Sequence, residues 1–339
     1  MSLPDLSRLA DTGAAGGDPL NEGNPHQIQL SNGVQLVKTY PEVSAAIGNY
    51  FLTSDPNQLG RGADASAWGH KATTPVAIYT IVYPPNHPLV TRFDALTDQY
   101  RRTTCPPEVV ADVEKYKGAF SASTKALAPI LSAAGLGATY VDTNINEQLL
   151  FHGTNFGSAA GIITNGFNGA QPGPPRLSMF GDGNYFADRP EKIDQYARGA
   201  SFDKIPLDLG DTWRQSIQTF MHRKSAKMQQ NNAWSPTPPY PPINDGVFPM
   251  LINRVVLGCP ALVDRCSYTV NRTTYGTGPV FSLVAPSLDR TLAKPYNSLI
   301  VLNEPVKAAP PYCSLRYKEY VTYRDDAALP QFLVLYMRL

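Results

Sequence analysis

The 339-residue sequence has little charge of either sign: Asp, Glu, Lys and Arg make up 17% of the chain, and the formal net charge is +1. Proteins that bind nucleic acid through its phosphates usually carry a basic patch, domain or tail. No basic domain or tail is visible in this sequence. We therefore do not expect nucleic acid to be a partner.

Long apolar segments are missing as well. No run approaches the roughly 18 apolar residues that a membrane-spanning helix needs. The N-terminus has neither the basic start nor the apolar stretch of a signal peptide. We therefore expect no membrane association and an intracellular location, either cytoplasmic or nuclear.

Cysteine is scarce, and its spacing is uninformative: only Cys105, Cys259, Cys266 and Cys313 occur. None of them forms a Cys-x-x-Cys pair, and no two histidines lie at zinc-finger spacing, so we expect no metal site. In a reducing compartment cysteines stay as free thiols. That is the state we expect for all four.

Several catalytic motifs are absent too. The sequence contains no Walker A loop, no His-Glu-x-x-His and no Gly-x-Ser-x-Gly, which excludes the commonest NTPases, zinc peptidases and esterases. Gly135-x-Gly137 is not a dinucleotide-binding fingerprint, because it follows an expected helix and Tyr140 takes the place of the third glycine.

The residues that are present predict a globular α+β protein. An apolar content of 42% supports a real core, and 31 prolines indicate many turns. Helical spacing is concentrated in the first half and strand-like segments in the second, which favours α+β over a repeating βαβ pattern. We expect helices over 41–52, 88–102, 106–116 and a stretch ending near 134, and strands over 27–38 (broken by a turn at 31–33), 75–83, 248–257, 298–302, 315–323 and 332–338.

The chain divides into two expected parts. Residues 1–71 form an N-terminal extension, partly flexible and of unknown function, and residues 72–339 form the main domain. The main domain carries an insertion at about 200–246, with a helix over 211–231 and a proline-rich segment. The basic side chains of that helix indicate either a solvated face or a docking element: Arg214, His222, Arg223, Lys224 and Lys227.

The segment Asn146–Tyr196 holds the candidate site. One expected strand ends in His152-Gly153, and a second reaches Tyr185 after Gly181-x-Gly183. Because glycine has no side chain, we expect a ligand to approach the backbone closely at these glycines.

Two tyrosines and a distant glutamate complete the candidate set. Tyr185 and Tyr196 can hold a flat ring between them, and stacking contributes about 0.5–1.5 kcal/mol per aromatic pair. Glu319 lies in a strand-like segment, where a carboxylate can stabilise positive charge that develops on a sugar. Each side chain alone would more often be structural, so the hypothesis depends on their combination.

Taken together, the segments LLFHGT, MFGDGNYFAD, KIDQY and KEYVTY resemble the catalytic domain of the poly(ADP-ribose) polymerase family, the diphtheria-toxin-like ADP-ribosyltransferases. The resemblance runs in order from about Val76 to Leu339 and is most specific over Asn146–Ala197. It implies the ADP-ribosyltransferase fold, an α+β fold in which two packed, mainly antiparallel sheets form an NAD cleft and helices are mostly N-terminal and flanking. It also makes residues 72–339 the catalytic domain.

The resemblance assigns the family's His-Tyr-Glu triad to His152, Tyr185 and Glu319. It implies that His152 binds the adenine-side ribose of NAD+ and that Tyr185 and Tyr196 stack on the nicotinamide. Glu319 would bind the nicotinamide ribose and stabilise the oxocarbenium-like transition state. The other NAD contacts that it implies are Gly153, through its backbone, Thr154, Phe186 and Ala187.

The resemblance also implies the reaction. NAD+ is consumed as a co-substrate without a metal, and ADP-ribose passes to a protein acceptor, the chain itself included. A donor-side loop would cover Asn165–Met179, and an acceptor-side loop would cover about Asn271–Leu283. We favour mono-ADP-ribosylation over polymer synthesis, because the chain is short and no DNA-sensing modules are recognisable, and we expect a monomer. Two alternatives stay open: a non-catalytic member that binds ADP-ribose or a partner, and a transferase that modifies nucleic acid.

One position departs from the family pattern. Three residues before Tyr196, where many members carry a serine that bonds the nicotinamide carboxamide, this chain has Ile193. One neutral hydrogen bond contributes about 0.5–1.5 kcal/mol. We therefore expect the affinity for NAD+ to fall by roughly tenfold at most, without loss of activity.

Overall fold

The structure is a computed structural model, and it describes residues 27–52, 73–103, 105–107, 109–111, 121–136, 141–169, 180, 183–201, 246–263, 292, 295–301 and 317–338. Two expected features lie wholly outside these residues: the helix with its proline-rich segment at 211–245, and the acceptor-side loop. Most of the donor-side loop and of the expected helix over 106–116 lie outside them too.

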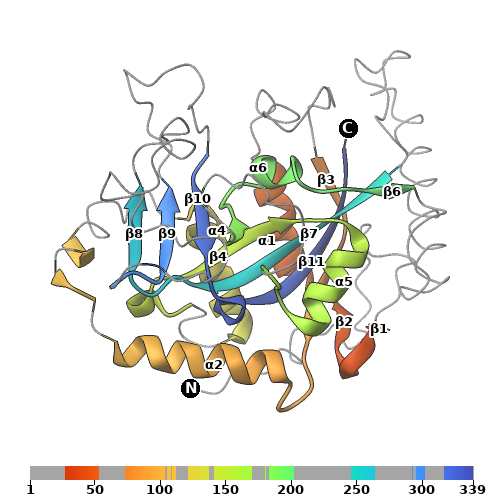
Figure 1. Cartoon of the computed structure of the whole chain (residues 1–339). Helices are drawn as coiled ribbons and strands as arrows, with labels where there is room; N and C mark the ends of the chain where they lie inside the picture. The colour runs from red at the N-terminus through yellow and green to blue at the C-terminus, as the bar shows by residue number, and fades with distance from the viewer. Residues whose placement is uncertain are drawn as a thin grey trace, which may run out of the picture.

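The larger of two sheets has seven strands in the order β1-β2-β3-β11-β7-β4, with β6 beside β7 (Figure 1). Its central strands β7 and β11 are mostly apolar and are buried along their whole length. All the pairings in this sheet are antiparallel. The strands span β1 Gln27–Gln29, β2 Gln35–Lys38, β3 Thr73–Val82, β4 Glu147–Gly153, β6 Ala200–Ser201, β7 Gly246–Val256 and β11 Ala328–Arg338.

The smaller sheet has four strands in the order β5-β10-β9-β8, and only β8 and β9 run parallel. A backbone bridge joins it to the larger sheet: Phe151 N–H donates to Ala187 O at 2.8 Å, and Ala187 N–H donates to Phe151 O at 3.1 Å. The two sheets therefore meet where β4 and β5 end. The strands span β5 Asn184–Phe186, β8 Pro260–Val263, β9 Ser298–Val301 and β10 Glu319–Thr322. This arrangement confirms the α+β prediction with two mainly antiparallel sheets.

The helices flank the sheets, and α2 runs along the outside at the bottom of Figure 1. Their bounds are α1 Pro41–Leu52, α2 Pro88–Arg102, α4 Ala122–Leu131, α5 Phe156–Asn165 and α6 Pro190–Asp194. A short π-helical turn η4 follows α4 at Ser132–Leu136, and the single 3-10 turns are η2 Ser31–Gly33, η5 Thr143–Ile145 and η8 Asp325–Ala327. Expected helices over 41–52 and 88–102 are confirmed, whereas α5 was not anticipated in a segment that resembled a Gly-rich loop.

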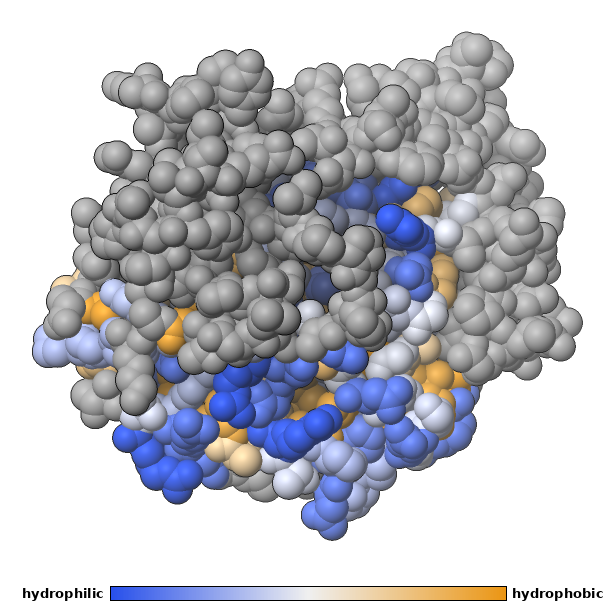
Figure 2. All heavy atoms as spheres, in the orientation of Figure 1, coloured by the Kyte–Doolittle hydropathy of each residue, from blue (hydrophilic) through white to orange (hydrophobic). Residues whose placement is uncertain are grey.

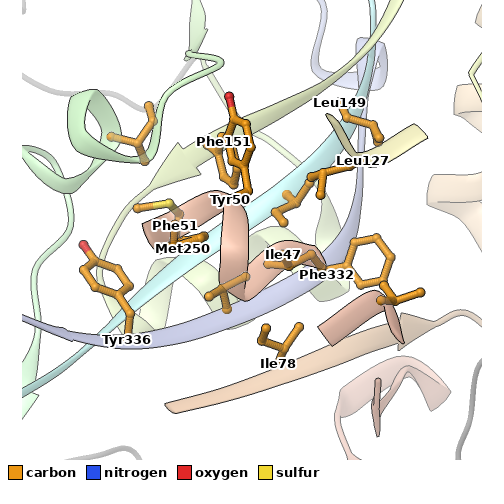
Figure 3. Packing of buried hydrophobic residues seen from close by; sticks show 14 of the residues in the cluster. Ile47, Tyr50, Phe51, Ile78, Leu127, Leu149, Phe151, Met250, Phe332 and Tyr336 are labelled. Carbon is orange, nitrogen blue, oxygen red and sulfur yellow. The ribbon is translucent and has the colours of Figure 1, made fainter. Parts of the chain in front are cut away.

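Helix α1 supports the strand that leads into the candidate site. The Tyr50 ring stacks on Phe151 at a centroid distance of 5.7 Å, and Phe51 meets the edge of Phe151 at 5.8 Å (Figure 3). Tyr50 also donates its hydroxyl to Asp188 O at 2.6 Å. The Asp188 carboxylate in turn accepts from Ala122 N–H at 2.9 Å, at the start of α4. Two helices from the first half of the chain thus hold the backbone just after β5.

Residues 27–52 are integrated into the main sheet. Strand β2 pairs with β3 along Gln35–Lys38, and α1 packs into the same apolar cluster as Ile78 and Phe332. The expected hairpin over 27–38, with its turn at 31–33, is present as β1, η2 and β2. The division at residue 71 stays a prediction, but the described residues before it pack as part of the same core.

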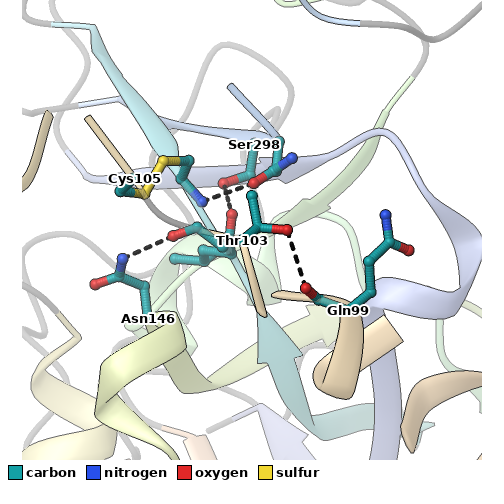
Figure 4. The surroundings of a disulfide bond; sticks show 9 residues. Gln99, Thr103, Cys105, Asn146 and Ser298 are labelled. Carbon is teal, nitrogen blue, oxygen red and sulfur yellow. Dashed lines mark hydrogen bonds between the residues drawn. A yellow bond between two sulfur atoms is a disulfide. The ribbon is translucent and has the colours of Figure 1, made fainter. Parts of the chain in front are cut away.

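A disulfide joins Cys105 to Cys259, whose Cα atoms are 5.6 Å apart. Figure 4 shows it among hydrogen bonds that fix the neighbouring backbone: Asn146 Nδ2 donates to Gly258 O, and Ser298 Oγ donates to Leu257 O, both at 2.7 Å. The expectation of free thiols is therefore wrong for these two cysteines, because the fold brings together residues that are 154 positions apart. Cys266 and Cys313 lie outside the described residues.

The face along α2, at the bottom of the view, is mostly hydrophilic with apolar residues scattered over it (Figure 2). None of the helices in the described part of the chain has both the length and the apolar character that crossing a membrane requires.

Candidate active site

His152 is the penultimate residue of β4, and its ring is held from three sides. Its Nδ1 lies 2.9 Å from Tyr185 O, and its ring contacts Phe167 and Phe186 at centroid distances of 5.0 and 5.7 Å. A carbonyl oxygen can only accept, so Nδ1 carries the hydrogen and Nε2 of the neutral ring is an acceptor. Burial lowers the pKa of His152, and the bond to Tyr185 O opposes that shift only in part. The imidazole is therefore neutral at pH 7, with Nε2 able to accept from a hydroxyl group.

Tyr185 is the middle residue of β5, directly beside β10. It pairs with Val321 in the antiparallel register, and its hydroxyl accepts from Phe180 N–H at 3.0 Å. The Tyr323 hydroxyl donates to the carbonyl of the same Phe180. Two tyrosines thus anchor the backbone of Phe180, and β5 is held between β4 and β10.

Glu319 begins β10 and is buried, but its carboxylate has a cationic partner. Lys192 Nζ, on α6, lies 2.7 Å from Glu319 Oε1. The same ammonium donates to the Tyr196 hydroxyl at 3.0 Å and lies 5.0 Å from the centre of that ring. Burial disfavours the charged amine, but Glu319 and Tyr196 together raise the pKa of Lys192 above its ordinary value. Lys192 is therefore a cation that links Glu319 to Tyr196.

Tyr196 follows α6 and is the most exposed of the large hydrophobic side chains that the structure describes. Its side chain is 43% exposed, although its neighbour Ala197 is buried. A partly exposed aromatic ring that Lys192 holds through its hydroxyl can receive a second flat ring.

The glycines beside the site have a packing role. A Cβ on Gly153 would lie 2.5 Å from Ile193 O, and a Cβ on Gly183 would lie 2.9 Å from Thr322 O. Both glycines therefore let α6 and β10 pack closely against the strands. The expected approach of a ligand to their backbone stays a prediction, and Gly181 lies outside the described residues.

Ile193 fills the space on the Cβ side of Gly153. It is 4% exposed, and its Cγ2 would lie 2.8 Å from a Cβ at that glycine. An apolar branched side chain thus stands next to the backbone that the family resemblance gives to the nicotinamide carboxamide.

The remaining expected NAD contacts surround these residues. Thr154 O accepts from Arg198 N–H at 3.1 Å, which ties the end of β4 to the turn after α6. Phe186 and Ala187 are fully buried, and Ala187 forms the bridge between the two sheets. Their contact with NAD+ stays a prediction.

Lys192 is the residue that sequence reasoning missed. The sequence did offer one indication of its role: Lys192 precedes Tyr196 by four positions, a spacing that brings two side chains together on one face of a helix. Its partner Glu319 is 127 positions away, so no local pattern could connect them. Within the described ranges, no three His, Cys, Asp or Glu side chains come together in a way that could hold a metal ion.

The geometry combines three chemical functions in one place. His152 offers a neutral acceptor, Tyr185 and Tyr196 offer aromatic surfaces, and Glu319 offers a carboxylate that Lys192 orients. A carboxylate beside an aromatic platform suits a sugar that becomes positively charged while a flat leaving group departs.

Comparison with known proteins gives the family. The model of the poly(ADP-ribose) polymerase catalytic domain matches residues 111–337, about two thirds of the 339-residue chain. The matched span contains His152, Tyr185, Lys192, Tyr196 and Glu319. A search of curated proteins found no match.

Proposed function

Because the chain belongs to the poly(ADP-ribose) polymerase catalytic-domain family, we propose that it transfers ADP-ribose from NAD+ to a protein acceptor. The observation that carries this proposal is the meeting of His152, Tyr185 and Glu319 on the adjoining strands β4, β5 and β10. Such a set can bind two riboses and a flat ring at once.

In this proposal His152 Nε2 accepts a hydrogen bond from the adenine-side ribose, and the nicotinamide lies between Tyr185 and Tyr196. Glu319 Oε1 is engaged by Lys192, whereas Oε2 makes no hydrogen bond to any residue that the structure describes. Oε2 is therefore the atom that accepts a hydrogen bond from a hydroxyl group of the nicotinamide ribose. Thr154, Phe186 and Ala187 line the same end of β4 and β5.

The chemical step breaks the bond between nicotinamide N1 and ribose C1′, and its electron pair leaves with the nicotinamide. Positive charge develops on the ribose and is stabilised by the Glu319 carboxylate. A nucleophile of the acceptor protein then bonds to C1′ and loses its proton. NAD+ is consumed in the step.

The acceptor class and the extent of transfer belong to the proposal as well. We propose mono-ADP-ribosylation by a monomer inside the cell, with the chain itself among its acceptors. Digestion of the product with a phosphodiesterase tests the extent: mono-transfer yields AMP and no phosphoribosyl-AMP, whereas a polymer yields phosphoribosyl-AMP.

The enzyme proposal is tested with NAD+ labelled in its adenylate part. Wild type should release nicotinamide and label protein, and Glu319→Gln should lower the rate about a hundredfold or more, because removal of one electrostatic stabiliser costs roughly that much. Glu42→Gln, on the exposed face of α1, is the matched control and should leave the rate unchanged. A folded wild type that releases no nicotinamide would sink the proposal.

A further inference from the structure

The short helix α6 and the turn after it carry two residues of the site, Lys192 and Tyr196. A helix of five residues has little stability of its own. Its position must therefore come from tertiary contacts, and β11 supplies buried hydrogen bonds at its C-terminal end.

Arg338, on β11, binds the C-terminal end of α6 through Nε and Nη2 of its guanidinium group. Nε donates to Asp194 Oδ1 at 2.9 Å, while Nη2 donates to Asp194 O at 2.6 Å and to Ala197 O at 3.1 Å. The Tyr336 hydroxyl donates to the same Asp194 Oδ1 at 2.6 Å. Arg338 and Asp194 are only 2% and 1% exposed, so water hardly competes for these bonds.

The two carbonyls that Arg338 binds stand on either side of Tyr196 in the chain. The guanidinium also packs over an aromatic ring, because its carbon lies 3.8 Å from the centre of the Phe248 ring. The β11 backbone at Arg338 pairs with Thr73 of β3. A rigid, planar side chain thus connects the main sheet to the turn that presents the stacking tyrosine.

We propose that Arg338 is a positioning residue for the nicotinamide end of the site, acting through Asp194 and the backbone on both sides of Tyr196. The inference rests on the proposed function. Arginine is required because its fork reaches a carboxylate and two carbonyls at once, whereas the single ammonium of lysine cannot match that geometry. Arg338→Lys should therefore loosen the turn while keeping the charge.

Arg254 provides a matched control. Its Nε lies 2.5 Å from Glu147 Oε1, the pair is buried, and its guanidinium also lies near an aromatic ring, that of Phe93. Glu147 begins β4, whereas His152 lies five residues further on, roughly 17 Å away along an extended strand. Arg254→Lys therefore perturbs a second buried arginine–carboxylate pair, formed with Glu147 of β4 and not with Asp194.

The first measurement needs no NAD+. Hydrogen–deuterium exchange over residues 190–198 should be faster in Arg338→Lys than in wild type and unchanged in Arg254→Lys. Unfolding by denaturant should show that both variants are folded. Unchanged exchange over 190–198 in Arg338→Lys would overturn the proposal.

The second measurement is the affinity for nicotinamide, by calorimetry. Arg338→Lys should weaken it about three- to tenfold, the range expected for loss of one stacking contact, and Arg254→Lys should not. In a Tyr196→Ala background, Arg338→Lys should cause no further weakening. Equal weakening in both backgrounds would overturn the role through Tyr196. If wild type binds no nicotinamide, the proposed function fails, and the exchange result still decides whether Arg338 holds the turn.

Discussion

Ile193 makes the part of the site that is proposed to bind nicotinamide more apolar than a serine would. Its side chain packs against Gly153, so a hydroxyl at this position would lie beside the backbone proposed to bind the carboxamide. Threonine and valine have nearly the same shape and differ by a hydroxyl in place of a methyl. Comparison of the two variants therefore isolates the hydrogen bond from the packing.

We predict that Ile193→Thr binds nicotinamide more tightly than Ile193→Val, by up to about tenfold, since one neutral hydrogen bond contributes about 0.5–1.5 kcal/mol. Calorimetry on both variants is the measurement. Both should be somewhat less stable than wild type, because a buried methyl group is lost from each. Equal affinities of the two variants would show that position 193 does not reach the carboxamide.

The protonation of His152 predicts an acid limit to NAD+ binding. Burial keeps its pKa in the folded protein below the ordinary 6.5, and only the neutral ring can accept at Nε2. At a pH near these pKa values the folded state binds fewer protons than the unfolded one. The contribution of His152 to the stability of the fold is therefore complete above the ordinary pKa of 6.5 and is lost as the pH falls below 6.5 towards the lower pKa of the folded protein.

NAD+ affinity measured from about pH 8 to pH 5 should therefore be constant at first and then fall, with a midpoint below 6.5. His152→Asn should bind more weakly at neutral pH and lose that acid-side fall. A midpoint above the ordinary value, or the same fall in the variant, would contradict the assignment.

At the scale of elements, β5 is the critical strand. It has three residues, yet it pairs with β10, and the residue after it bridges to β4. Gly183 allows the close approach to β10. A Cβ there would meet Thr322 O at 2.9 Å and the Val321 side chain as well.

We predict that Gly183→Ala destabilises the fold by about 1–3 kcal/mol, the usual cost of overpacking, and weakens NAD+ binding because Tyr185 shifts with its strand. Gly161→Ala is the control. Gly161 lies in α5 with nothing within 4 Å of its would-be Cβ, so alanine should stabilise the helix by about 0.5–1 kcal/mol. Denaturant unfolding measures both effects, and equal stability of the two variants would refute the packing role of Gly183.

Sequence patterns predicted the elements that local chemistry defines. The strands expected over 248–257 and 332–338 and the helix expected over 88–102 correspond to β7, β11 and α2. Helix α5 was missed because FGSAAGIITN contains two glycines, and its start depends on Asn155, whose side chain accepts from Ser158 N–H. The Lys192–Glu319 pair and the packing role of Gly153 depend on contacts between distant segments, and no local pattern carries them.

On the scale of the whole molecule, the disulfide closes a long loop between Cys105 and Cys259. A bridge of that span strongly restricts the conformations of the unfolded chain, and such bridges contribute about 2–5 kcal/mol to the free energy of unfolding. We predict a loss of that size in Cys105→Ser. Treatment with a reductant should lower the stability of wild type by a similar amount and leave Cys105→Ser unchanged. A wild type insensitive to reductant would show that the bond does not form in solution.

The same bond bears on where the protein works, since glutathione and thioredoxin keep thiols reduced in the cytosol. Alkylation of Cys105 in freshly lysed cells tests the expected intracellular location. A reactive thiol fits a cytoplasmic or nuclear protein, and a protected one argues for an oxidising compartment.

The position of β11 in the larger sheet also sets the order in which the molecule can be made. This strand lies between β3 and β7. During synthesis the edge of β3 that pairs with β11 therefore stays unpaired until residues 328–338 have left the ribosome. Pairings between such distant segments form slowly and leave strand edges exposed in the meantime. Because Arg338 belongs to that strand, its bonds to Asp194 O and Ala197 O, on either side of Tyr196, form only after β11 has joined the sheet.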